Sequence, residues 1–149
     1  MAYTIGRQRD KPYARAIWCY ERIYAPINHD NSHWFFLVIY PREREIVIVD
    51  SLYTYLTPKF KHKMKNMTDA LPVLFHATGD ITALEGKKWT VRFDESAPKR
   101  DNGYDCGIFV MKFIDILCSG LTLERIDMQK FTSDWRKSIA YDCLFVVRR

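Results

Sequence analysis

The segment around Cys106 places a thiol where a protein can activate it. Cys106 follows a turn-forming Asp101-Asn102-Gly103 segment and precedes an apolar run long enough for a helix. Its side chain is therefore expected in the first helical turn, where unpaired N–H groups and the helix dipole favour thiolate over thiol. Such a cysteine is either a nucleophile or a buried structural residue. The nucleophile interpretation requires that the chain also supply a base, an orienting acid and an oxyanion site.

Two consecutive strands are predicted ahead of this cysteine. Residues 33–40 are continuously apolar and rich in aromatic and β-branched side chains, which predicts a strand buried on both faces. Residues 44–50 predict a second strand. The connection through Pro41-Arg42-Glu43 is so short that the two strands must form an antiparallel hairpin.

The hairpin brings His33, at the start of the first strand, towards Asp50, at the end of the second. With the turn centred between Pro41 and Arg42, the two residues are directly opposed, with Cβ atoms about 4.5–5.5 Å apart on one face. An imidazole and a carboxylate at that distance can hydrogen-bond. We therefore expect His33 to accept the Cys106 proton and Asp50 to orient it, as a cysteine hydrolase requires.

Further elements are predicted around the hairpin. Alternating or apolar-periodic patterns predict strands at 22–27 and 89–94 and helices starting near 58, 106 and 128. Pro72 is expected to end or kink the first of these helices. The helix that begins at Cys106 is apolar on nearly every side, which predicts a central buried position.

The composition is that of a globular domain with its own core. The chain has 149 residues, 48% of them hydrophobic and 15% aromatic, which suits one packed domain and argues against disorder. The net charge of +5 is scattered, so nucleic-acid binding is not expected. A basic run at 59–65 is either a solvated helix face or a docking surface for an acidic partner.

The four cysteines form no CxxC pair, and no signal-peptide pattern precedes them. We therefore expect an intracellular chain with reduced thiols. The longest unbroken apolar run, at 34–40, is far too short to span a membrane. No zinc-like cluster and no Gly-rich phosphate loop occurs, so neither a metal nor a cofactor is expected.

Several short motifs in this order resemble the SUMO/sentrin-specific protease family, the adenain-like cysteine proteases of clan CE. The motifs are Ala25-Pro26-Ile27-Asn28, His33-Trp34, Asp50-Ser51 and Asn102-Gly103-Tyr104-Asp105-Cys106-Gly107. The match runs from about residue 24 to 143, and the last motif resembles plant members, including transposon-derived ones. Each motif alone is weak, but their order and spacing together are specific.

The resemblance implies an α+β fold with a papain-like or adenain-like core. In that core a central mixed sheet is flanked by helices, and the nucleophile stands at the N-terminus of a buried helix. His33, Asp50 and Cys106 are then base, orienter and nucleophile. Trp34 and Gly107 contact substrate, with Trp34 beside the narrow channel for the substrate's C-terminal Gly-Gly. Core packing is the alternative role for Trp34.

The same resemblance implies a cellular setting. The family processes ubiquitin-like proteins such as SUMO and removes them from lysines, which implies such a protein and its conjugates as partners. We expect a monomer that is nuclear or cytoplasmic and not secreted, without nucleic-acid or membrane binding.

Two departures from the family pattern stand out. Arg100 occupies the position of the glutamine whose amide donates to the oxyanion, and loss of one such donor typically costs on the order of 10²–10³ in rate. The arginine can still donate and would bring positive charge near the thiolate, but its length and charge favour turning to solvent. In addition, only residues 1–32 precede His33. Either the catalytic domain is N-terminally truncated or Trp18, in a short substitute segment, lines the channel.

Three functions remain open on these grounds. The first is an active peptidase and isopeptidase on SUMO or a related protein. The second is an impaired homologue that binds such a protein without efficient cleavage. Arg100 and the short segment before His33 favour this second function. The third is acyl transfer by the same triad, against which Trp34 argues. A purely structural or nucleic-acid-binding protein fits least, because no patterned basic and aromatic face is present.

Overall fold

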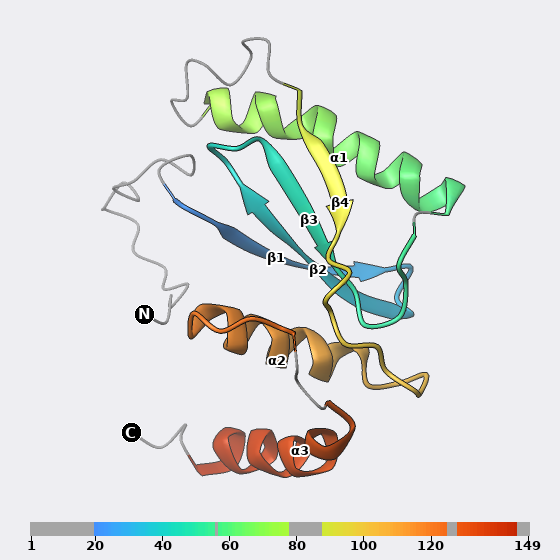
Figure 1. Ribbon diagram of the computed structural model, residues 1–149, viewed down its shortest axis with the longest axis vertical. Coiled ribbons are helices and arrows are strands. Elements are labelled where there is room, and N and C mark those ends of the chain that lie inside the picture. Colours follow the sequence, from blue (N-terminus) through green and yellow to red (C-terminus); the bar gives the residue numbers. More distant parts are fainter. Residues whose placement is uncertain (1–19, 56, 78–87, 125–127, 146–149) are drawn as a thin grey trace.

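A mixed four-stranded sheet lies between helices in the computed structural model, which describes residues 20–55, 57–77, 88–124 and 128–145 (Figure 1). The strands, in spatial order, are β1 (Ile23–His29), β2 (His33–Tyr40), β3 (Glu45–Val49) and β4 (Thr90–Phe93). β1, β2 and β3 are successively antiparallel, whereas β4 runs parallel to β3. The parallel pair is joined through α1 (Pro58–Ala77), as a crossover connection requires.

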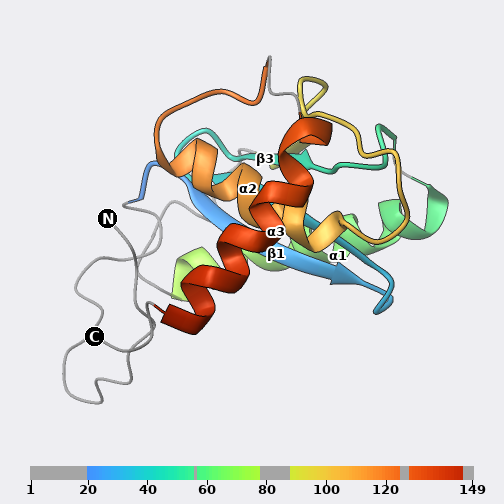
Figure 2. The same ribbon diagram turned by 90° about the horizontal axis from the view of Figure 1, so that it is seen from below.

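The helices form layers on the two sides of this sheet. α1 covers one face and α2 (Cys106–Cys118) the other, while α3 (Met128–Phe145) lies beyond α2 (Figure 1). The view from below shows α3 crossing in front of α2, away from the sheet (Figure 2). None of the helices in the described ranges combines the length and hydropathy needed to cross a membrane.

β2 is buried on both faces, as its continuous apolar run predicts. Phe35, Leu37 and Ile39 pack in the core on the α1 side. Phe36 and Val38 pack on the α2 side. Successive side chains of a strand point to opposite faces of the sheet, and an apolar layer covers each face.

The predicted hairpin register is wrong by two residues. Tyr40 pairs with Glu45, not with Glu43. The connection is a four-residue turn at 41–44 that ends with Arg44 in the left-handed region, at φ 59°. That residue turns the chain back into β3, so the loop closes two positions later than a turn centred beside Pro41 would allow.

Of the two expectations for Pro72, an end or a kink of the helix, the end is wrong, because α1 continues to Ala77. Proline removes one backbone hydrogen bond from a helix interior. Leu71 and Phe75, on either side of it, are 8% and 1% exposed and pack against the sheet. Burial of these side chains outweighs the lost bond, since most helical stability in a protein comes from tertiary packing.

α2 has the central position that its composition predicts. Phe109, Val110, Phe113 and Ile116 are buried against the sheet. The helix ends before Gly120, whose φ of 76° is the left-handed conformation that glycine adopts readily. This anchoring holds the N-terminal end of α2, and with it Cys106, in a fixed place beside the sheet.

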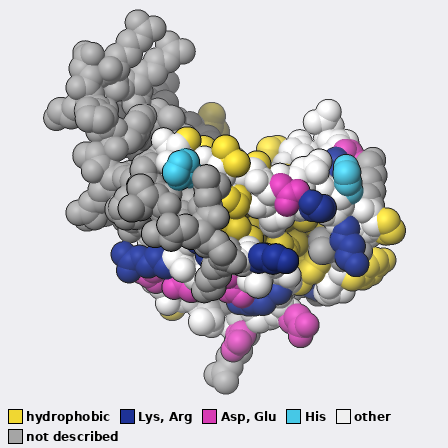
Figure 3. All heavy atoms as spheres, turned by 90° about the horizontal axis from the view of Figure 1, so that it is seen from above, with side chains coloured by type: hydrophobic (Ala, Val, Ile, Leu, Met, Phe, Trp, Pro, Cys, Tyr) yellow, Lys and Arg dark blue, Asp and Glu magenta, His cyan; other side chains and the backbone are white. Residues whose placement is uncertain are grey.

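The side chains of the basic run on α1 that the structure describes do not form a continuous basic patch. Lys63 pairs with Asp30, and Lys65 pairs with Asp69. On the face seen from the α1 side, Lys and Arg side chains lie in separate groups among acidic and other side chains (Figure 3). This favours the solvated helix face over the docking surface.

Candidate active site

His33 and Asp50 form a buried hydrogen-bonded pair, so the predicted contact is present. The Nε2 atom of His33 lies 2.9 Å and 3.0 Å from the two carboxylate oxygens of Asp50. The side chains of His33 and Asp50 are buried, and Asp50 Oδ1 also accepts the backbone N–H groups of Leu52 and Tyr53 at 2.7 Å and 3.0 Å. The carboxylate therefore fixes the tautomer with hydrogen on Nε2, which leaves the Nδ1 lone pair as the basic site.

The contact survives the register error for a geometric reason. In the observed register Asp50 lies diagonally across from His33 rather than directly opposite. A shift of two residues leaves a side chain on the same face of a sheet. Diagonal neighbours are roughly 7–8 Å apart between Cα atoms, which an imidazole and a carboxylate can bridge.

The segment after β3 is held against this pair by contacts that sequence reasoning missed. The ring of Tyr53 meets the His33 ring edge-on, with 5.4 Å between the centroids. Lys99 Nζ donates to the carbonyl oxygens of Asp50 and Tyr53 at 2.7 Å and 3.1 Å. Burial lowers the pKa of Lys99, and the nearby Asp50 charge opposes that shift. No local pattern marks Lys99, because its partners lie far away in the sequence.

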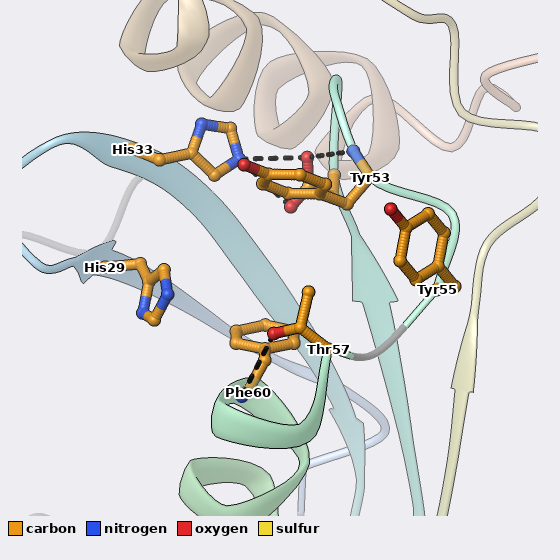
Figure 4. A pocket seen from close by; sticks show the side chains of 7 residues that line it. His29, His33, Tyr53, Tyr55, Thr57 and Phe60 are labelled. Atoms are coloured by element: carbon orange, nitrogen blue, oxygen red, sulfur yellow. Dashed lines mark hydrogen bonds and ion pairs between the residues drawn. The ribbon is translucent and has the colours of Figure 1, made fainter.

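A small pocket of about 60 Å³ opens beside the pair (Figure 4). Besides the pair itself, its lining residues are His29, Tyr53, Tyr55, Thr57 and Phe60. Tyr53 and Tyr55 follow β3, whereas Phe60 comes from the first turn of α1 (Figure 4). The pocket is therefore mainly aromatic and adjoins the Asp50 side of the imidazole.

Cys106 is the first residue of α2 and is 6% exposed, with a free thiol. The preceding residue, Asp105, makes no side-chain cap to the helix. Its carboxylate instead accepts from Asn102 Nδ2 at 2.8 Å and from the guanidinium of Arg136 on α3. The positive end of the helix thus remains directed at the thiol.

The loop before Cys106 is shaped by Asn102. Its Oδ1 accepts the backbone N–H groups of Tyr104 and Asp105 at 3.1 Å and 3.0 Å. Arg136 also lies over the ring of Tyr104, 5.4 Å from its centroid. The loop that leads to Cys106 is therefore held in place by contacts with α3. The spacing of the sequence motif could not show these contacts.

Arg100 is buried, contrary to the expectation that it turns to solvent. It is 8% exposed. Its backbone N–H donates to Ser51 O at 2.8 Å, which holds this segment against the end of β3 and directs the side chain inward. The guanidinium donates through Nη1 to Asn102 O and through Nη2 to His33 Nδ1, the latter at 3.2 Å. The arginine thus occupies the lone pair that a base needs.

Trp34 and Gly107 lie together at the start of α2. A Cβ atom on Gly107 would be 3.7 Å from Trp34 Cδ1. Trp34 is 40% exposed, so the core-packing alternative for this residue is wrong. The exposed ring instead forms part of the surface beside Cys106. Trp18, the alternative channel residue, lies outside the described residues.

Comparisons with known proteins identify the family of the chain. The family model described as "Ulp1 protease family, C-terminal catalytic domain" matches residues 3–144. The putative ubiquitin-like-specific protease 1B of Arabidopsis thaliana is 35% identical over 103 residues, covering 68% of this chain and 28% of the relative. The ubiquitin-like-specific protease ESD4 of the same plant is 34% identical over 113 residues, covering 69% and 20%. The chain thus spans less than a third of the length of these relatives.

Solved structures share the fold. The C-terminal Ulp1 protease domain in complex with SMT3, the yeast orthologue of SUMO, matches with a TM-score of 0.60 at 24% identity, over 82% of this chain and 51% of that one. The SUMO protease Ulp1 with its catalytic cysteine oxidised to a sulfenic acid matches with a TM-score of 0.64 at 24% identity, over 87% and 55%. The predicted α+β fold is confirmed.

Proposed function

Because this chain belongs to the Ulp1 protease family, whose model covers residues 3–144, we propose that it is a thiol protease acting on SUMO or a related ubiquitin-like protein. It cleaves after the C-terminal Gly-Gly, both in precursors and in conjugates to lysine. The observation that carries the proposal is the buried His33–Asp50 hydrogen bond, in a domain whose Cys106 opens α2. This bond makes Nδ1 the basic atom once the guanidinium of Arg100 moves off it.

The proposed reaction follows from the roles of three side chains. His33 Nδ1 takes the proton of the Cys106 thiol, and the sulfur attacks the carbonyl carbon of the terminal glycine. The C–N bond breaks, and the imidazolium returns the proton to the leaving amine, while Asp50 stabilises the imidazolium. A water molecule, deprotonated by His33, then attacks the thioester. The thiol is regenerated, and the ubiquitin-like protein leaves with a carboxylate.

The proposed substrate preference rests on Trp34. Its partly exposed ring beside Gly107 supports a narrow passage to the sulfur. Only residues without side chains allow a backbone to pass close to an aromatic wall, so a Gly-Gly end suits the passage.

A second candidate function is favoured by one observation. The hydrogen bond from Arg100 Nη2 to His33 Nδ1 competes with the thiol for the base. A domain in which this bond persists binds a ubiquitin-like protein without efficient cleavage. The two candidates differ in turnover, not in the partner.

The decisive experiment is a panel of SUMO, NEDD8 and ubiquitin probes that carry a C-terminal electrophile. We expect at least one probe to label the wild type but not Cys106→Ala. Cys118→Ala is the matched control, because Cys118 is a second free cysteine, exposed at the far end of the same helix. The proposed protease function is contradicted if a probe labels Cys106→Ala. It is also contradicted if no probe labels any of the proteins. Labelling without release of a C-terminal fluorophore identifies the impaired binder.

A further inference from the structure

The guanidinium of Arg100 is a buried cation with no carboxylate partner among the described residues. Its two hydrogen-bond acceptors, Asn102 O and His33 Nδ1, are both neutral groups. Its Nε atom is buried without any acceptor. Buried charges are normally paired, because the loss of hydration must be offset by a counter-charge. This arginine therefore lacks the anion that its burial calls for.

The nearby acidic side chains are already engaged. Asp50 binds His33 and two backbone N–H groups. Asp105 binds Asn102 and Arg136. Neither carboxylate is available to Arg100 without breaking a contact that shapes the site. Asp101, the next residue, is exposed and accepts from Asn102 Nδ2 at 3.3 Å, so no described carboxylate pairs with the guanidinium and a ligand can supply the anion.

The N-terminus of α2 adds a second source of positive potential next to the arginine. Arg100 contacts Asn102, Asn102 contacts Asp105, and Asp105 directly precedes the first helical residue. The Asp105 carboxylate makes no hydrogen bond to the helix start, and the first turn of α2 holds no acidic residue. Free N–H groups at a helix start and a guanidinium form a site for an anion.

The chemistry of a guanidinium selects among possible anions. A tetrahedral oxyanion is one oxygen and is transient, and a neutral amide serves it well. A carboxylate has two coplanar oxygens and a permanent charge, which match the planar donor fork of arginine. The proposed reaction leaves such a group at this place, since the released protein ends in a glycine carboxylate.

We propose that Arg100 and the N-terminus of α2 form a binding site for the C-terminal carboxylate of the cleaved ubiquitin-like protein, so that the domain retains its product. This inference rests on the proposed function. Exchange of the neutral His33 acceptor for a carboxylate oxygen replaces an ordinary hydrogen bond by a stronger charge-assisted one. The same exchange frees His33 Nδ1. The guanidinium therefore binds either the product carboxylate or His33 Nδ1, but not both at once.

The test compares two ligands that differ only at the terminus. One is SUMO ending in a Gly-Gly carboxylate, and the other is the same protein with a C-terminal carboxamide. Binding is measured by calorimetry to the Cys106→Ala chain, which cannot hydrolyse the carboxamide. We expect the carboxylate form to bind roughly 10- to 100-fold more tightly, the range of a charge-assisted hydrogen bond. Adding Arg100→Gln should reduce the ratio to near one, and Arg100→Lys should keep part of it.

The outcomes separate this inference from the proposed function. If the two ligands bind the Cys106→Ala chain with equal affinity, the proposed carboxylate site is wrong. The proposed protease function still stands in that case, provided that the SUMO probe labels the wild type. Absence of binding by both ligands overturns the SUMO partner as well. The ligand comparison needs no change at Arg100, so it decides the question even if the Arg100 variants do not fold.

Discussion

Replacement of Arg100 by glutamine should speed up turnover. In the structure the guanidinium donates to His33 Nδ1 at 3.2 Å, so the thiol must displace it before its proton can be taken. Glutamine is shorter and uncharged. It removes this competitor and supplies an amide at the position where the resemblance implies an oxyanion donor. Its side-chain amide can also donate to Asn102 O, which otherwise loses its partner.

The size of the effect follows from the bond that is removed. A hydrogen bond from a charged donor is worth about 1.5–3 kcal/mol. At 3.2 Å the Arg100–His33 bond is long, so we take the lower end, and about 1.4 kcal/mol corresponds to a tenfold change in rate. An amide that reaches the oxyanion adds further to this, because one such donor contributes on the order of 10²–10³. We therefore expect kcat/KM to rise roughly tenfold or more.

The assay is release of a fluorophore from the C-terminus of a ubiquitin-like protein. Two further variants separate the causes. Arg100→Ala frees the base without supplying an amide, so its rate should lie between those of the wild type and Arg100→Gln. Arg100→Lys keeps a buried cation near His33 and should give no rise. Thermal melting of each variant controls for folding, since Arg100 is only 8% exposed.

The reasoning is refuted if Arg100→Gln, folded as well as the wild type, is no faster. That result would mean that the guanidinium leaves Nδ1 without cost when substrate binds. A rate equal to that of Arg100→Ala would instead show that the gain comes entirely from freeing the base.

Three further substitutions test the remaining parts of the site. Asp50→Asn should lower kcat on the order of 10⁴-fold, because the amide cannot stabilise the His33 imidazolium; a small loss would deny Asp50 its orienting role. Trp34→Ala should lower kcat/KM for a ubiquitin-like substrate about tenfold while changing the free energy of unfolding by less than about 1 kcal/mol, as expected for a partly exposed side chain; strong destabilisation would contradict a surface role. Burial lowers the pKa of Lys99 below its ordinary value of 10.5, so the folded chain binds the Lys99 proton less tightly than the unfolded chain does. The free energy of unfolding of the wild type, relative to that of Lys99→Met, should therefore rise as the pH approaches 10.5. Urea unfolding at pH 7 and at pH 10 measures this, and a constant difference would count against the shift.

Elements that depend on local pattern were predictable from the sequence. The strand at 33–40 and the helix at Cys106 are found where the apolar patterns place them. The strand is buried on both faces and the helix on the face towards the sheet, so their residue types carry the signal directly. The motifs around His33, Asp50 and Cys106 were enough to indicate the family, since the order and spacing of these residues are features of the sequence itself.

Details that depend on contacts between distant segments were not predictable. The turn after β2 closes two residues later than predicted, because Arg44 adopts a left-handed conformation that no local signal required. α1 continues past Pro72 because packing on both sides of the proline outweighs one backbone bond. In α1 a tertiary interaction thus overrides a sound local preference.

The sequence alone determined which groups could perform chemistry: a thiol at a helix start, an imidazole and a carboxylate at matching ends of a hairpin, and an arginine where the resemblance implies a glutamine. Only the tertiary structure decided where the arginine points. A backbone hydrogen bond to Ser51 turns Arg100 inward onto His33 Nδ1. Side-chain direction depends on neighbours brought together from separate parts of the chain, and the residue type at one position does not encode them.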